Sequence, residues 1–160
     1  MSKIALFAGT FDPPTLGHIN IINRCSALYE KLYVVIAHNI NKQCLFSANE
    51  RSDMLHKLLK DNKNIEVVIY EGLIVNFAKE HDVSVMIRGV RALADFSYEF
   101  ELAMTNKQLY PKVETLFMPT DPKYFLVRSS QIKELAKFGA DISNMVPQLV
   151  VNKINEKLGF

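Results

Sequence analysis

The chain has no tryptophan, and its 160 residues include only two cysteines, Cys25 and Cys44. The cysteines do not form a C-x-x-C motif, and no histidine pair has the spacing of a zinc finger. With so few cysteines, a fold held together by disulfide bonds is excluded, and no structural zinc site is indicated. We therefore expect both cysteines to be reduced thiols.

Long apolar runs and charge blocks are also missing. The first apolar stretch, residues 4–8, is too short for a signal peptide, and no run approaches the roughly eighteen residues of a membrane helix. The net charge is only +2, and no block of like charges indicates a nucleic-acid-binding surface or tail. These absences predict a soluble, cytoplasmic protein that binds neither nucleic acid nor membrane.

Apolar residues make up 49% of the chain, enough for one domain over residues 1–160 with a core of its own. Five short apolar runs lack polar alternation, as is typical of strands buried on both faces of a parallel sheet. They are residues 4–8, 32–37, 65–70, 83–87 and 114–118.

Helical patterns lie between these runs. Apolar residues recur at helical spacing after residues 18 and 53, and Ser47 and Glu50 have the spacing of a capping box. Further helices are expected over residues 73–81, 95–109 and 129–138, and after Pro147. The alternation predicts an α/β fold, a Rossmann-like doubly wound sheet of about five parallel strands with helices on both faces. Such sheets bind ligands beyond the carboxyl ends of their strands.

The segment GTFDPPTLGH, residues 9–18, follows the first expected strand. It contains neither the G-x-G-x-x-G motif of dinucleotide-binding folds nor the P-loop motif. A lone histidine is usually structural, but His18 stands at the start of a helix, where free N–H groups attract phosphate. Gly17 permits close backbone approach, and Thr10 adds a hydroxyl to the same loop. We therefore single out His18 and expect the other three histidines to be structural.

Cations follow two of the expected strands. Lys42 lies after the second strand, and Arg88 and Arg91 lie after the fourth. One such cation is usually just solvated, but three at neighbouring strand ends fit a single polyanion that spans several loops. Asp95 and Glu99 share a helix face with Arg91, and a surface salt bridge between Arg91 and Asp95 is expected.

Taken in order, GTFDPPTLGH, the lysine, RGVR and RSSQIKE make the chain resemble the phosphopantetheine adenylyltransferase family over nearly its whole length. Residues 15–18 match the T/H-x-G-H motif of the wider nucleotidyltransferase superfamily. The stretch RGVRALADFSYEFELAMTN, residues 88–106, is far more specific to this family. The resemblance implies AMP transfer from ATP to 4'-phosphopantetheine, giving dephospho-coenzyme A and pyrophosphate, with Mg²⁺ arriving on ATP.

The resemblance also implies roles for individual residues. His18 would be catalytic, Thr10 and Lys42 would hold the phosphate of phosphopantetheine, Arg88 would support it, and Ile74 would line the pantetheine arm. ATP would be bound by Thr10, Phe11, His18, Gly89, Val90, Arg91, Glu99, Tyr124, Phe125, Leu126, Val127, Arg128, Ser129 and Ser130. The resemblance further implies a homohexamer, and the apolar residues of the 95–109 helix hint at a subunit interface.

The implied chemistry suits these residue types. The attacking phosphate oxygen is already anionic, so catalysis needs no protein base and depends on positioning and charge neutralisation. The chain departs from the family at Phe125 and Arg128, where serines are usual, and Ser129 or Ser130 is expected to cap the following helix. Two rivals are a cytidylyltransferase of the same superfamily and a catalytically silent nucleotide-binding protein. Residues 88–99 argue against the first, and the intact T-L-G-H motif with Thr10 and Lys42 argues against the second.

Overall fold

The computed structural model describes residues 3–37, 43–91 and 93–160. Its strands are β1 (Ile4–Gly9), β2 (Lys31–Ala37), β3 (Ile65–Tyr70), β4 (Val85–Val90) and β5 (Glu114–Pro119). Its helices are α1 (Leu16–Ser26), α2 (Ala48–Leu58), α3 (Ile74–Glu80), α4 (Leu93–Leu109), α5 (Ser129–Lys137) and α6 (Gln148–Leu158), with a short 3-10 helix over Pro122–Tyr124. The predicted α/β class is confirmed.

The strands form one parallel sheet in the order β3-β2-β1-β4-β5. β1 lies between β2 and β4, and Ala5 pairs with Leu32 on one side and Val85 on the other. The chain winds outward from β1 in both directions. The carboxyl ends of β1 and β4 therefore flank the topological switch point, where open α/β sheets bind their ligands.

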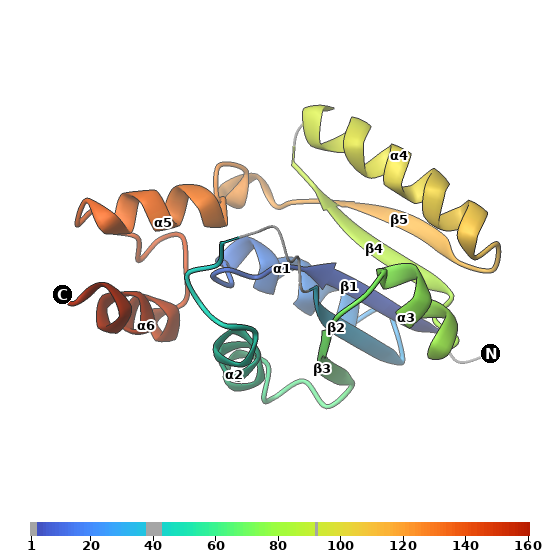
Figure 1. The fold of residues 1–160 in the computed structure, drawn as a ribbon, viewed down its shortest axis with the longest axis horizontal. Coiled ribbons are helices and arrows are strands. Elements are labelled where there is room, and N and C mark those ends of the chain that lie inside the picture. Colours follow the sequence, from blue (N-terminus) through green and yellow to red (C-terminus); the bar gives the residue numbers. More distant parts are fainter. Residues whose placement is uncertain (1–2, 38–42, 92) are drawn as a thin grey trace.

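Helices cover both faces of the sheet (Figure 1). Ile22 of α1 and Leu55 of α2 join Val34 in the core on one face. On the other face, Phe77 of α3 packs with Val35. These inward-facing side chains are almost fully buried, which accounts for the continuous apolar runs of the strands.

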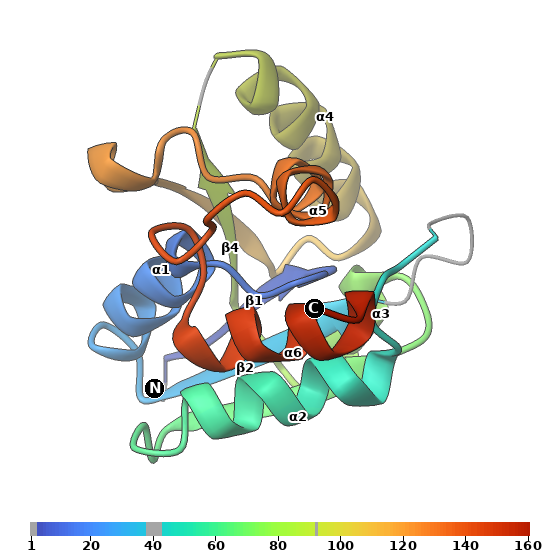
Figure 2. The ribbon, with the colours of Figure 1, turned by 90° about the vertical axis from the view of Figure 1, so that its left-hand side faces the viewer.

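The last two helices pack beyond the sheet. Ile132 of α5 and Val150 and Ile154 of α6 form a separate core cluster with Met54 of α2. Figure 2 shows α6 lying along α2, with α5 next to it. The amino terminus of α5 thereby comes to the carboxyl edge of the sheet.

The structure corrects two local expectations. β4 begins at Val85 because the N–H of Val83 bonds to the carbonyl of Ala78 in a turn, and the strand continues to Val90 because it pairs with β5. Arg88 therefore lies within the strand instead of after it. At α5 the N-cap is Arg128, without a side-chain hydrogen bond, so the expected serine cap is wrong. The hydroxyl of Ser129 donates to the carbonyl of Pro13 instead, 2.9 Å away.

Other local expectations are confirmed. Ser47 and Glu50 form the capping box of α2. Cys25 is buried and Cys44 is exposed, and both are free thiols. None of the helices in the described residues is both long enough and apolar enough to cross a membrane.

Candidate active site

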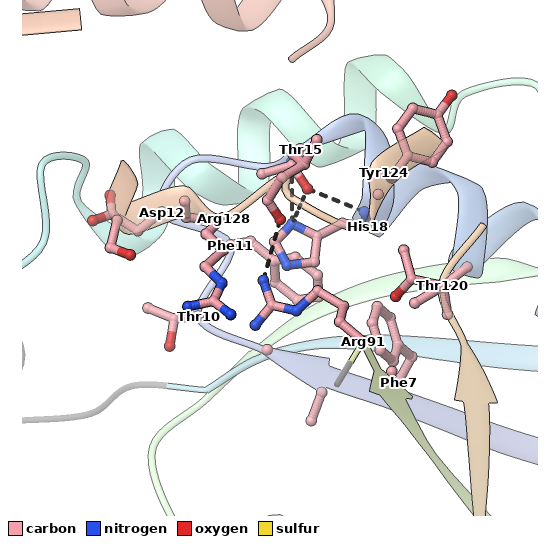
Figure 3. A pocket seen from close by; sticks show the side chains of 18 of the residues that line it. Phe7, Thr10, Phe11, Asp12, Thr15, His18, Arg91, Thr120, Tyr124 and Arg128 are labelled. Carbon is pink, nitrogen blue, oxygen red and sulfur yellow. Dashed lines mark hydrogen bonds between the residues drawn. The ribbon is translucent and has the colours of Figure 1, made fainter. Parts of the chain in front are cut away.

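A cavity of about 760 Å³ lies at the carboxyl ends of β1 and β4 (Figure 3). It is bounded by the turn after β1, the start of α1, the end of β4 and the start of α5. Twelve of the residues singled out from the sequence line it: Thr10, Phe11, His18, Arg88, Gly89, Arg91, Glu99, Tyr124, Val127, Arg128, Ser129 and Ser130. The fold thus brings together groups from both ends of the chain.

Other predicted site residues do not line the cavity. Ile74 is the first residue of α3 and packs against the core between α3 and the sheet, on the face opposite to α1 and α2. Val90 ends β4, while Phe125 and Leu126 are exposed. Lys42 lies outside the described residues. The roles assigned to these residues stay predictions.

His18 is held by the cap of its own helix. Thr15 is the N-cap of α1: its hydroxyl accepts from the N–H of His18 at 3.2 Å, and its own N–H donates to Nδ1 of His18 at 3.1 Å. Because Nδ1 accepts this bond, the proton of a neutral ring is on Nε2. Both bonds follow from the three-residue spacing of the T-L-G-H motif. The motif therefore presents Nε2–H as a donor.

The surroundings of His18 keep its ring neutral. Burial, and then the nearby positive charge of Arg91, lower the pKa of His18 from 6.5 to about 4. Burial acts because it penalises the charged imidazolium, and a neighbouring cation repels a second positive charge. At neutral pH, His18 is thus a hydrogen-bond donor without a net charge.

The two arginines are fixed by carboxylates. Arg88 donates through Nε and Nη2 to both carboxylate oxygens of Glu99, with 2.8 Å between Nη2 and Oε1. Nε of Arg91 lies 3.1 Å from Oδ2 of Asp95, which confirms the expected salt bridge, and its Nη1 donates to the carbonyl of Val127. These ion pairs fix the orientation of both guanidinium groups, whose remaining N–H groups can donate to a phosphate. The cavity therefore offers two placed cations and one neutral donor.

Known proteins that resemble this chain include enzymes that transfer nucleotides. The cytidylyltransferase-like family model matches residues 6–135. The phosphopantetheine adenylyltransferase of Dictyoglomus turgidum is 48% identical over 153 residues, covering 96% of each chain. That of Caldanaerobacter subterraneus is 44% identical over 155 residues, covering 97% of each chain. This chain belongs to the phosphopantetheine adenylyltransferase family.

A solved structure described as a putative nicotinate-nucleotide adenylyltransferase from Vibrio parahaemolyticus has a TM-score of 0.70 over 99% of this chain and 95% of its own. Its sequence identity is 20%, so the likeness concerns the fold alone. Within this chain, the 88–106 stretch supplies the two ion pairs beside the cavity, Arg88 with Glu99 and Arg91 with Asp95.

Sequence reasoning missed several residues of this cavity. Asp12, Thr120 and Lys133 also line it. Thr120 directly follows β5, and Lys133 is one helical turn beyond Ser129 on α5. The positions of Thr120 and Lys133 could therefore have been noticed in the sequence. The buried carboxylate of Asp12 lies 2.7 Å from Nζ of Lys133, and that contact could not be read from spacing.

Arg128, where the sequence departs from the family that it resembles, lines the cavity. Its side chain is exposed to solvent and extends toward Thr10 in Figure 3. This agrees with the inward orientation that an anionic ligand would favour.

The neutral state of His18 predicts a specific pH dependence. Its folded pKa of about 4 lies below the ordinary 6.5, so the unfolded chain binds a proton first as the pH falls. The free energy of unfolding should therefore be unaffected by His18 above pH 6.5 and should fall between pH 6.5 and 4. We expect wild type to lose more stability from pH 7 to pH 5 than His18→Gln does, measured by urea unfolding. Equal losses in the two proteins would contradict the assigned pKa.

Proposed function

We propose that this protein transfers AMP from ATP to 4'-phosphopantetheine, forming dephospho-coenzyme A and pyrophosphate. The observation that carries the proposal is the convergence of the neutral His18 donor and the paired Arg88 and Arg91 on one cavity, at the switch point of the sheet. The curated relatives that match over nearly the full chain carry the name of this activity.

The reaction needs charge stabilisation more than proton transfer. An anionic oxygen of the phosphopantetheine phosphate attacks the α-phosphorus of ATP; the new P–O bond forms as the bond to the pyrophosphate oxygen breaks. His18 donates from Nε2 to the developing charge, and Arg91 adds positive charge beside it. Among the described residues no side chain caps α5, which leaves the N–H groups of its first turn for the departing phosphates.

We propose that Mg²⁺ enters the cavity bound to ATP. The two acidic side chains of the described lining, Asp12 and Glu99, are each paired with a cation, Lys133 and Arg88. No group of three potential metal ligands occurs within residues 3–37, 43–91 and 93–160. Magnesium commonly keeps waters and binds through substrate phosphates, where it neutralises their charge. Chelation should abolish turnover, with recovery on adding Mg²⁺; activity in excess chelator would refute the proposal.

The deciding experiment mixes purified protein with ATP and 4'-phosphopantetheine and follows the products by mass spectrometry. Dephospho-coenzyme A together with pyrophosphate is the expected result. Product from CTP but not from ATP would favour a cytidylyltransferase. Nucleotide binding without any product would show a silent nucleotide-binding protein.

Replacing Arg128 with the usual family residue should weaken ATP use moderately. A charged hydrogen bond contributes about 1.5–3 kcal/mol, and partial solvation should keep this one near the low end, so Arg128→Ser should raise the KM for ATP by about tenfold or less. The kcat should stay within a few-fold, because the contact is to phosphates remote from the reacting phosphorus. Steady-state kinetics with varied ATP test this. A collapse of kcat would place Arg128 at the transition state, and an unchanged KM would make it a bystander.

We also propose a homohexamer in the cytoplasm. Support for assembly comes from large apolar side chains of α4 and β5 that are exposed to solvent: Phe96, Tyr98, Phe100, Met104 and Leu116. Large exposed apolar patches of this kind mark protein interfaces. The two free thiols suit a reducing compartment. Light scattering tests the assembly, and a monomeric mass would refute it.

A further inference from the structure

Phe11 has an unusual backbone conformation at the edge of the cavity. Its φ is +51°, in the left-handed region that non-glycine residues rarely adopt. The turn folds the buried ring back toward β1, so that a Cβ atom added to Gly9 would lie 3.0 Å from the ring. The ring also lies edge-on to the His18 ring, with 5.0 Å between the two ring centroids. Such a conformation persists only when surrounding contacts hold it.

One of these contacts comes from Arg51, which lies outside the cavity. Its side chain is 2% exposed, and its Nη1 donates to the carbonyl of Thr10 at 2.6 Å. Its Nε donates to the carbonyls of Phe46 and Ser47 at 3.1 and 3.2 Å. Among the residues that the structure describes, Arg51 forms no ion pair. Its buried charge is thus compensated by backbone carbonyls, and it joins the turn after β1 to the segment before α2.

The bond to Thr10 sets the direction of a peptide group. In a trans peptide the C=O and the following N–H point in opposite directions, and the Thr10–Phe11 peptide is trans. Thr10 and Phe11 line the cavity (Figure 3), whereas Arg51 is buried and does not line it. With the Thr10 carbonyl turned toward Arg51, the N–H of Phe11 points away from Arg51. This N–H has no acceptor within the described residues.

We propose that Arg51 is a positioning residue, which turns the Thr10–Phe11 peptide so that the Phe11 N–H donates to a phosphate oxygen of a substrate. The inference rests on the proposed adenylyl transfer. A preorganised backbone N–H is a strong donor to phosphate and needs no reorganisation during reaction. The charge of Arg51 acts through the peptide and touches neither substrate.

The test replaces Arg51 with methionine, which keeps its approximate length, and with lysine, which keeps the charge but loses the fork. Arg24→Met is the matched control, because Arg24 donates similarly to a carbonyl, that of Pro119 at 2.8 Å, without lining the cavity. Arg51→Met should lower kcat/KM by about tenfold or more, with Arg51→Lys intermediate and Arg24→Met unchanged. A rise in KM for ATP alone, or for phosphopantetheine alone, identifies whose phosphate receives the N–H.

A second readout separates positioning from folding. In ¹⁵N NMR spectra the Phe11 amide of wild type should shift on addition of ATP or phosphopantetheine, and the shift should disappear in Arg51→Met. If that variant shows no cooperative melting, Arg51→Lys decides by the same measurements. Kinetics within about twofold of wild type, or a Phe11 amide that responds as in wild type, would overturn the inference. Absence of product from wild type itself would instead defeat the proposed function, and the NMR arm would still decide the role of Arg51.

Discussion

His18→Ala should lower kcat by roughly a hundred- to a thousandfold, the loss expected on removing one preorganised donor to developing charge. The ring of His18 is oriented by the hydrogen bond that the Thr15 N–H donates to Nδ1, and it is kept neutral by burial and Arg91, so its Nε2–H is available without prior proton loss. Phosphopantetheine binding should stay nearly intact, since this donor acts mainly on the transition state.

Steady-state turnover, with titration calorimetry for phosphopantetheine, measures both effects. His56→Ala is the control: His56 is an exposed residue of α2 whose ring hydrogen-bonds to Ser52 of the same helix, and it does not line the cavity. That variant should retain wild-type kcat. A normal kcat in His18→Ala would remove His18 from the catalytic role.

Asp12→Ala should destabilise the protein by about 3 kcal/mol, the effect of breaking a buried charged network. The carboxylate of Asp12 is 4% exposed and accepts from the N–H groups of Leu45 and Phe46, each at 2.9 Å, as well as from Lys133. Its loss leaves two N–H groups and a partly buried ammonium without their acceptor. Because Asp12 joins three segments, the whole carboxyl edge of the sheet depends on it.

Urea unfolding at one protein concentration measures this effect. Glu156→Ala is the control, since Glu156 forms an exposed ion pair with Lys153 within one helix. Exposed pairs contribute about 0–1 kcal/mol, so the control should change little. A cost for Asp12→Ala no larger than that of Glu156→Ala would show that the network does not stabilise the fold.

The architecture was predictable because its signals are local. Strands buried on both faces need continuous apolar runs, and the five runs fell on the five strands. Capping boxes depend on residues three apart, so that of Ser47 and Glu50 was readable from the spacing alone. The limits of β4 could not be predicted in this way, because pairing with β5 extends the strand through Arg88 and Gly89.

The contacts of the candidate site likewise fall into local ones and long-range ones. The sequence by itself predicted the salt bridge of Arg91 with Asp95, and the cap of Thr15 on His18, which was not predicted, is equally local, because helix geometry brings residues three or four apart together. Only the tertiary structure decided that Asp12 meets Lys133, 121 residues away, and that Arg51 reaches the carbonyl of Thr10, 41 residues away. Such long-range contacts depend on the order of the strands and the packing of the helices, so the spacing of residues along the sequence does not predict them.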